Sequence, residues 1–269
     1  MPNRFLIYTI ANYTKQQVSM IRYMLKSLSR YTNVDAYDLL IVTNRNFQDH
    51  IASWNVSKRF NLLFSIHNTD KTLEDEKMKK IKIFDYFPDV KNYDKVLYLD
   101  YDCVVEGDIV HLFKQAQLAK GRLYPYPEDR DLTKIFYGLQ SYSEKDLMYF
   151  EQNGIAGFST GVFMFKPSRE IATHFLNVQK EAMTFHGQHF YEQSFMNHYF
   201  NKKRLANTSV LAGVVKSRNI KAECGPPMIR DSDINLDVAI THFCGIGYYK
   251  ERLMRMRRYY RMIKHYKRA

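Results

Sequence analysis

Short runs of apolar residues alternate along this chain with longer stretches in which apolar residues recur every three or four positions. The short runs are rich in β-branched and aromatic residues and are bounded by turn residues, so they predict buried strands at Phe5–Ile10, Asp38–Thr43, Leu62–His67 and Val96–Leu99. After the first of them, Gln17–Tyr31 places apolar residues along one helical face. This order of strand, loop and helix predicts an α/β fold with a central mixed, mostly parallel sheet flanked by helices.

The second half of the chain continues this alternation with less regular spacing. We expect strands at Arg122–Tyr126, Phe158–Phe165 and Val238–Phe243. Residues 132–153 are rich in tyrosine and show no clean period. Upstream, Leu73–Phe87 predicts one helix whose lysines form a mainly solvated face, the usual meaning of a run of charge.

Two carboxylates, Asp100 and Asp102, directly follow the strand predicted at Val96–Leu99. Ligands of open α/β sheets collect where strands end, so both side chains can point into one crevice. Oxygen ligands this close together favour Mg²⁺ or Mn²⁺. A calcium loop is excluded because Val104 and Val105 stand where that loop needs an acid and a glycine. An acidic turn without a metal is the other reading.

Four segments, in order, resemble motifs of the retaining glycosyltransferases of family 8, the group of glycogenin and the lipooligosaccharide galactosyltransferases. They are YLDYDCVVEGDIVHLF at 98–113, FSTGVFMFKPS at 158–168, YEQSFMN at 191–197 and THFCGIGYY at 241–249. Together the matches run from Phe5 to about Lys250. The resemblance implies a GT-A-type nucleotide-sugar domain over 1–249, with a nucleotide-binding part at about 1–110 and a sugar and acceptor part at about 111–249.

The resemblance also implies a metal site and a catalytic pair. His242 would complete the metal shell with Asp100 and Asp102, and its neutral imidazole favours Mn²⁺, with Mg²⁺ as the alternative. Glu192 would bind hydroxyls of the donor sugar. Gln193 would lie on the face of the anomeric carbon opposite the leaving diphosphate.

Further residues are expected to bind the nucleotide or donor sugar of a UDP-sugar. By resemblance, the loop after the first strand contacts the nucleotide, where a tyrosine can stack on uracil, and a basic residue on the helix at 73–87 reaches the donor. The expected set is Thr9, Asn12, Tyr13, Lys80, Tyr101, Ser159, Gly245, Gly247 and Lys250.

At several positions the sequence departs from the family pattern. Ile10 or Ala11 replaces an acid that reads the uracil edge, and Ser159 or Thr160 replaces an asparagine. Tyr248 occupies the position of a basic residue, with Lys250 two residues later. Glu192 replaces the more usual aspartate.

The charge of the chain lies mainly in its C-terminal tail, residues 250–269. The formal net charge is +12, and the tail carries nine Lys and Arg residues against one Glu. With Leu253, Met256, Tyr260 and Ile263 among them, these residues predict either an amphipathic helix on an anionic membrane or a solvated helix packed on the domain. No nucleic-acid recognition motif is present, so nucleic acid is not an expected partner.

Cysteine content and the N-terminal sequence predict a cytoplasmic protein, peripheral on a membrane if the tail binds one. Cys103, Cys224 and Cys244 are odd in number and have no framework spacing. The first apolar run is too short for a signal peptide, and no stretch is apolar enough to span a membrane.

We expect a Mn²⁺-dependent enzyme that moves glucose or galactose from a UDP-sugar to a hydroxyl of a glycan or glycolipid. A sugar nucleotidyltransferase is a second hypothesis, disfavoured because the first loop, TIANYTKQQ, has no glycine. A non-enzymatic basic protein that binds membranes or nucleic acid is the third. Removal of the tail is expected to leave hydrolysis by a transferase intact.

Overall fold

The computed structural model describes residues 4–68, 73–131, 142–184, 192–218, 239–244 and 249–266. The chain folds as two compact units. Unit 1 comprises residues 1–4, 70–98 and 117–212, and unit 2 comprises residues 5–69, 99–116 and 213–269. The chain passes between these two units more than once along its length. The expected nucleotide-binding part at about 1–110 and the sugar and acceptor part at about 111–249 stay predictions.

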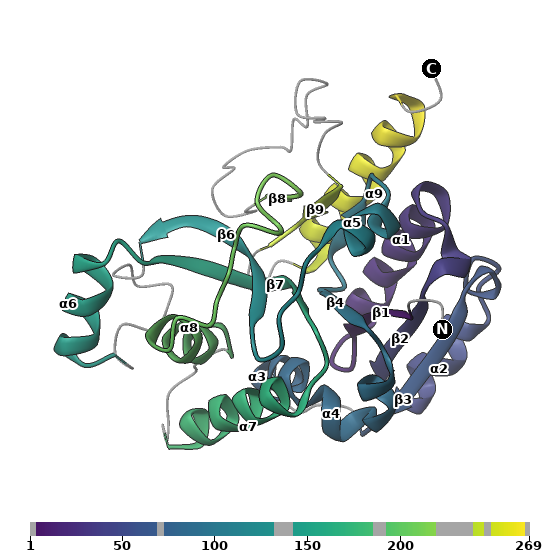
Figure 1. Ribbon diagram of the computed structural model, residues 1–269. Helices are drawn as coiled ribbons and strands as arrows, with labels where there is room; N and C mark the ends of the chain where they lie inside the picture. Colours follow the sequence, from purple (N-terminus) through teal and green to yellow (C-terminus); the bar gives the residue numbers. More distant parts are fainter. Residues whose placement is uncertain are drawn as a thin grey trace. The chain divides into compact units, whose positions relative to one another are not determined.

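Unit 2 begins with three parallel strands that alternate with helices (Figure 1). The strands are β1 (Phe5–Ile10), β2 (Asp38–Thr43) and β3 (Asn61–Ile66), hydrogen-bonded in the order β3-β2-β1. They are joined by α1 (Lys15–Tyr31) and α2 (Arg45–Ala52). Every residue of β1 is buried, which is why its sequence reads as a continuous apolar run.

Local signals place the starts of these helices at the ends of the strands. Thr14 and Gln17 form a capping box that starts α1 just beyond β1. Asn44 caps α2 directly after β2 by accepting a hydrogen bond from the Phe47 amide at 3.0 Å. The carboxyl edge of the three strands is therefore fixed by short turns.

A second sheet in unit 2 joins segments that are far apart in the sequence. It consists of β5 (Cys103–Val105), β9 (Ile240–His242) and β8 (Val215–Ser217), in the order β5-β9-β8. β5 and β9 are antiparallel, and their register pairs Cys103 with His242. α5 (Ile109–Gln115) follows β5, and α9 (Tyr249–Tyr266) is the C-terminal helix.

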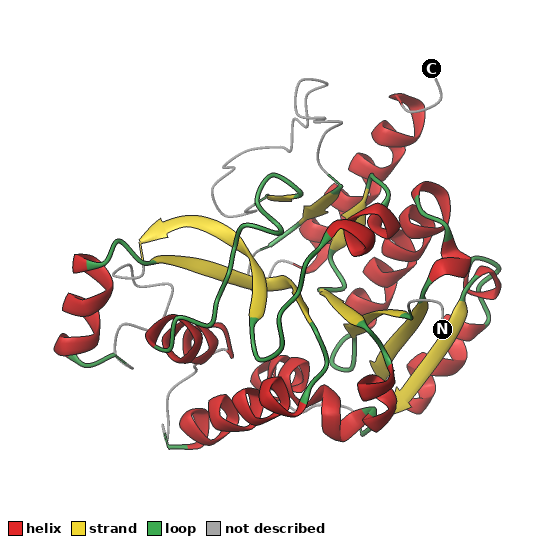
Figure 2. Ribbon diagram, viewed as in Figure 1, coloured by secondary structure: helices red, strands yellow, loops and turns green. Residues whose placement is uncertain are grey.

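Unit 1 contains β4 (Lys95–Leu99), β6 (Leu123–Asp131) and β7 (Ala156–Phe165), hydrogen-bonded in the order β4-β7-β6. The division between the units falls within β4, whose last residue belongs to unit 2. β6 and β7 are antiparallel and form the long two-stranded ribbon drawn in yellow in Figure 2. β6 continues to Asp131, beyond the strand expected at Arg122–Tyr126.

The β6–β7 ladder contains an irregularity at Thr160. Its register passes from Pro125 opposite Phe163 to Tyr126 opposite Ser159, so Thr160 has no partner on β6. The prolines at 125 and 127 cannot donate to the ladder, which favours such a break. Bulges of this kind redirect backbone groups and often lie beside active sites.

In the described part of unit 1 the α-helices are α3 (Leu73–Met78), α4 (Ile83–Tyr86), α6 (Glu144–Gln152), α7 (Arg169–Met183) and α8 (Glu192–Lys202). Ser168 caps α7 by accepting a hydrogen bond from the Ile171 amide at 3.3 Å. Stacked and edge-on aromatic rings pack β7 against α7 and α8, namely Phe163, Phe165, Phe175 and Phe200.

The single helix predicted over Leu73–Phe87 is wrong. α3 ends at Met78, and a 3₁₀ turn over Lys79–Lys82 precedes α4. The tighter turn puts Lys79 and Lys80 in the interior, so the expectation that these lysines lie on a solvated face is wrong for both.

Candidate metal and donor-sugar sites

Three residues of unit 2 converge to form a candidate metal site. Asp100 and Asp102 follow β4, and the β5–β9 register brings His242 beside them. His242 Nε2 lies 3.5 Å from Asp100 Oδ2 and 3.2 Å from Asp102 Oδ1. The three ligand atoms lie within 4.8 Å of one another. The structure therefore brings together the three side chains that the sequence predicted as metal ligands.

The chemistry of this trio fits a divalent ion. Asp102 is only 2% exposed, and no hydrogen bond from the described residues reaches its buried Oδ1. A buried carboxylate oxygen without a donor is costly, and a cation removes that cost. Two oxygens and one imidazole nitrogen suit Mn²⁺.

Arg252 of α9 contacts the same site, which the sequence did not predict. Its Nη1 donates to Asp102 Oδ2 at 2.5 Å and to the Tyr101 hydroxyl at 3.5 Å. Burial lowers the pKa of the Arg252 guanidinium, but the Asp102 carboxylate outweighs this effect and raises that pKa overall. Lys250, the basic residue expected here, is exposed at the start of α9.

A second contact ties α9 to the strand that carries His242. The Tyr259 hydroxyl donates to the buried Glu106 carboxylate at 2.8 Å, and Thr241 beside His242 donates to the same carboxylate. Burial and the nearby Glu106 charge raise the pKa of Tyr259. Glu106 follows β5, so this network joins β5, β9 and α9.

α9 packs on unit 2 through its apolar face. Met256, Tyr259 and Ile263 are buried, and the rings of Tyr260 and Tyr23 of α1 lie 6.0 Å apart. Of the four apolar residues expected to enter a membrane, Met256 and Ile263 are therefore in the protein core. The packed helix, the alternative left open by the sequence, is the arrangement observed.

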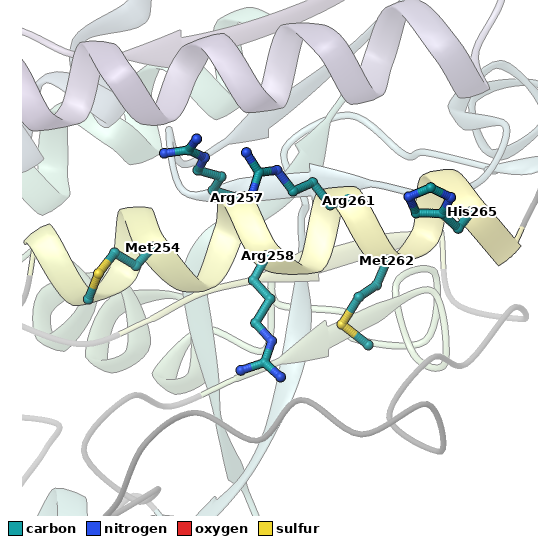
Figure 3. A pocket seen from close by; sticks show the side chains of 6 residues that line it. All are labelled: Met254, Arg257, Arg258, Arg261, Met262 and His265. Carbon is teal, nitrogen blue, oxygen red and sulfur yellow. The ribbon is translucent and has the colours of Figure 1, made fainter.

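The outward side of α9 is basic. Figure 3 shows side chains of this helix that line an open hollow of about 470 Å³, namely Met254, Arg257, Arg258, Arg261, Met262 and His265. Met254 is 60% exposed. The spacing of 252, 255, 256, 259 and 263, one helical face, is the signal by which the sequence could have revealed which tail residues turn inward.

A separate polar cluster in unit 1 joins the two predicted sugar-site residues to Lys80. Lys80 Nζ lies 2.7 Å from Glu192 Oε1, and both side chains are almost completely buried. The Thr160 hydroxyl donates to the same Glu192 oxygen at 2.9 Å. Among the described residues, no hydrogen-bond partner reaches the buried Glu192 Oε2, which leaves that oxygen able to accept from a ligand hydroxyl.

The irregular part of β7 supports this cluster. The Thr160 amide donates to Gln193 Oε1 at 3.3 Å, and the Thr160 carbonyl accepts from Lys80 Nζ at 3.4 Å. Asn197 holds α8 to β7 by exchanging two hydrogen bonds with the Phe158 backbone at 2.9 Å. Ser159 is buried and accepts from the Gly161 amide at 3.2 Å. Of the two residues proposed to replace the family's asparagine, Thr160 is thus the one that contacts Glu192 and Gln193.

The residues predicted in the first loop lie at the edge of the parallel strands of unit 2. Asn12 is buried, and its Nδ2 donates to the Asn68 carbonyl at 2.5 Å, which links the ends of β1 and β3. Tyr13 is half-buried. Thr9 lies within β1, and its buried hydroxyl has no hydrogen-bond partner in the described part of the chain. Gly245 and Gly247 lie outside the described residues.

Comparison with known proteins agrees with this fold. The sequence matches the profile of glycosyl transferase family 8 over residues 5–247. A crystal structure of galactosyltransferase LgtC in complex with donor and acceptor sugar analogs superposes with a TM-score of 0.62 at 13% identity, over 97% of this chain and 95% of that one. The apo structure of the bifunctional glycosyltransferase WbbM gives a TM-score of 0.58 at 14% identity, over 94% of this chain and 49% of that one. Among curated proteins, none matches this sequence.

This chain belongs to glycosyl transferase family 8. Its fold is the GT-A-like α/β fold with a mixed, mostly parallel sheet and a C-terminal helix, so the fold class and family predicted from the sequence are confirmed. None of the helices in the described ranges has both the length and the apolar character needed to cross a membrane.

Proposed function

We propose that this protein is a retaining glycosyltransferase that moves a hexose, glucose or galactose, from a UDP-sugar to a hydroxyl of a glycan or glycolipid. The observation that carries the proposal is the convergence of Asp100, Asp102 and His242, with ligand atoms within 4.8 Å of one another. Membership of family 8 supports the reaction class. The choice of UDP and of these hexoses rests on the resemblance of the motifs.

In this proposal Asp100, Asp102 and His242 hold Mn²⁺, with Mg²⁺ as the alternative. When bound, the ion supplies positive charge to the diphosphate that leaves the donor sugar, which lowers the barrier of the transfer. Buried Asp102 Oδ1 offers one ligand atom and His242 Nε2 another. Asp100 is less buried, so its oxygens lie nearest to solvent.

Glu192 and Gln193 act on the sugar. Glu192 Oε2 accepts a hydrogen bond from a sugar hydroxyl, while Lys80 and Thr160 hold the other oxygen. Lys80 therefore orients Glu192 instead of reaching the diphosphate. Gln193 stabilises positive charge at the anomeric carbon, and because an amide is a poor nucleophile, we infer a front-face path in which the leaving phosphate accepts the acceptor proton.

The nucleotide lies over the loop after β1. Tyr13 stacks on the base, a contact worth roughly 1 to 3 kcal/mol by analogy with other base–aromatic stacking. Asn12, Thr9 and Tyr101 contribute to the same subsite, with Ser159 toward the sugar. Gly245, Gly247 and Lys250 remain proposed contacts of the diphosphate.

An anionic membrane is a proposed partner through the outward side of α9. The exposed arginines of the hollow in Figure 3 support an electrostatic contact, to which each basic residue near the surface adds about 1 kcal/mol. Because Met256 and Ile263 are buried, this contact does not require insertion of the helix. Cosedimentation with phosphatidylserine vesicles that weakens as salt rises would support it.

The deciding experiment is a screen of UDP-sugars for hydrolysis without acceptor, with Mn²⁺ and with EDTA. We expect turnover of UDP-glucose or UDP-galactose with Mn²⁺ and its loss with EDTA. Turnover that survives EDTA would refute the metal assignment. Release of pyrophosphate from UTP and a sugar phosphate would instead identify a nucleotidyltransferase.

A further inference from the structure

Arg252 binds the carboxylate that the proposed metal ion requires. Its Nη1 lies 2.5 Å from Asp102 Oδ2, and its guanidinium carbon lies 5.5 Å from the centre of the Tyr249 ring. The side chains of Arg252 and Asp102 are 6% and 3% exposed. The cation is therefore held beside Asp102 in a place where water screens its charge poorly.

The formal charges of Asp100, Asp102 and Arg252 do not balance the charge of a divalent ion that binds without a nucleotide. Asp100, Asp102 and Arg252 together carry a single negative charge when His242 is neutral. A divalent ion would make the group positive, and the nearby guanidinium would repel it. A diphosphate brings negative charge and restores the balance, so binding of the ion and of the diphosphate should be coupled.

An alternative role of the contact between Arg252 and Asp102 is to orient Asp102 as a metal ligand. Partners of that kind commonly raise metal affinity by about 10- to 100-fold. The two roles differ in sign, because loss of an orienting residue weakens binding of the ion whereas loss of a competing cation strengthens it. The charge decides our choice, since Arg252 occupies Asp102 Oδ2 with a full positive charge, whereas the buried Oδ1 accepts no hydrogen bond from the described residues and lies 3.2 Å from His242 Nε2.

We propose that Arg252 is a built-in counter-ion that competes with the divalent ion for Asp102, so that the ion binds tightly only together with the diphosphate. This inference rests on the metal site of the proposed function and adds to it the coupling between the two ligands. Arg252 is thus a positioning residue that acts through Asp102. It also means that removing the tail would alter the metal site, so the expectation that hydrolysis survives this deletion is withdrawn.

The test measures Mn²⁺ affinity by electron paramagnetic resonance, first without nucleotide and then with saturating UDP. Arg252→Gln removes the charge and keeps an amide donor. Arg252→Lys keeps the charge. Arg261→Gln makes the same change of charge on the exposed side of the same helix and is the matched control.

Without nucleotide, Arg252→Gln should bind Mn²⁺ about tenfold more tightly than the wild type, within the usual range of coupling between ligands. With UDP the difference should shrink to about threefold or less. Mn²⁺ should also raise the unfolding temperature of Arg252→Gln more than that of the wild type, because a ligand stabilises the state that it binds. Arg252→Lys and Arg261→Gln should resemble the wild type.

Equal or weaker Mn²⁺ binding by Arg252→Gln would overturn the proposal, as would equal tightening by Arg261→Gln. If the neutral variant does not fold, Arg252→Lys decides: affinity unchanged from the wild type supports competition by charge, and a change of about tenfold or more in either direction refutes it. Failure of the metal site itself gives a different result, since Asp102→Asn would then leave Mn²⁺ binding unchanged.

Discussion

The candidate metal cluster of unit 2 (Asp100, Asp102 and His242) and the Lys80–Glu192 cluster of unit 1 both bury carboxylates, but they neutralise them differently. In unit 1, Lys80 lies 2.7 Å from Glu192, so the chain supplies a complete partner for that charge. In unit 2, Arg252 pairs with Asp102 Oδ2, and Asp102 Oδ1 accepts no hydrogen bond from the described residues, although His242 Nε2 lies 3.2 Å from it. Each cluster keeps one buried carboxylate oxygen without a hydrogen-bond partner among the described residues, Glu192 Oε2 in the first and Asp102 Oδ1 in the second. The difference lies in charge, because the Lys80–Glu192 pair is neutral whereas Asp100, Asp102 and Arg252 together carry a negative charge.

This difference indicates what each cluster can do. A buried ion pair is rigid, because removing either partner leaves a costly unpaired charge. Such a pair suits the fixed reading of sugar hydroxyls. A cluster with unsatisfied negative charge can instead take up and release a cation, which suits a leaving diphosphate.

The largest effect is expected from a substitution in the candidate metal cluster. Asp102→Asn should reduce Mn²⁺-dependent UDP-sugar hydrolysis by about 10³-fold, because the neutral amide is a weak ligand and several kcal/mol of charge stabilisation are lost. Initial rates over a range of Mn²⁺ concentrations measure this. Asp35→Asn, the same change at an exposed position of unit 2, should leave the rate unchanged. Equal rates in both variants would contradict the assigned role.

The next largest effect is expected from a substitution that breaks the Lys80–Glu192 pair in unit 1. Lys80→Met should destabilise the protein by about 3 to 5 kcal/mol, because it leaves the buried Glu192 charge unpaired. The double variant Lys80→Met/Glu192→Leu should be more stable than the single variant. Urea unfolding measures both. Lys82→Met, on the same 3₁₀ turn but half-buried, should cost less than about 1 kcal/mol. Additive costs in the double variant would show that the two residues are not coupled.

A smaller effect is expected at the contact by which α9 supports β9, the strand that carries His242. Tyr259→Phe should cost about 1 to 3 kcal/mol of unfolding free energy, because buried Glu106 loses a donor at 2.8 Å. Tyr260→Phe, on the same helix and only half-buried, should cost about 0.5 kcal/mol or less. Equal costs would mean that the Glu106 contact contributes nothing specific.

The smallest effect is expected at a second carboxylate cluster of unit 1. The positively charged partners of these carboxylates are side chains of the protein itself. Burial lowers the pKa of His198, but Glu181 and Asp146 outweigh it and raise that pKa overall. This contribution to stability is complete below the unfolded pKa of about 6.5 and is lost as pH rises through the folded pKa. The free energy of unfolding should therefore fall, as pH rises above about 6.5, more in the wild type than in His198→Gln. Parallel profiles would contradict the raised pKa.

At low pH, Asp146 of the same cluster changes the stability of the protein in the opposite direction. Burial raises the pKa of Asp146, but hydrogen bonds from Lys202, Ser143 and His198 lower it well below its usual value. Its contribution is present above the unfolded pKa and is lost as pH falls through the folded one. In urea unfolding below pH 4, the free energy of unfolding of Asp146→Asn should depend less on pH than that of the wild type.

The sequence by itself determined the elements and motifs whose signals are local. Apolar runs and helical spacing predicted the α/β fold, and the spacing of Asp100 and Asp102 after a strand predicted where carboxylates collect. Four motifs in order identified the family, and the resemblance predicted site roles for His242, Glu192 and Gln193. These signals are readable because strand alternation, helix caps and short motifs depend on neighbours in sequence.

Only the tertiary structure decided which distant residues meet. The pairing of Arg252 with Asp102, 150 positions apart, depends on how α9 packs, and the pairing of Lys80 with Glu192 depends on a 3₁₀ turn and an irregular ladder. Residue type could not reveal these contacts, because a lysine or arginine among many looks the same whether solvated or buried. Burial makes the distinction, since a charge removed from water must find its partner within the fold.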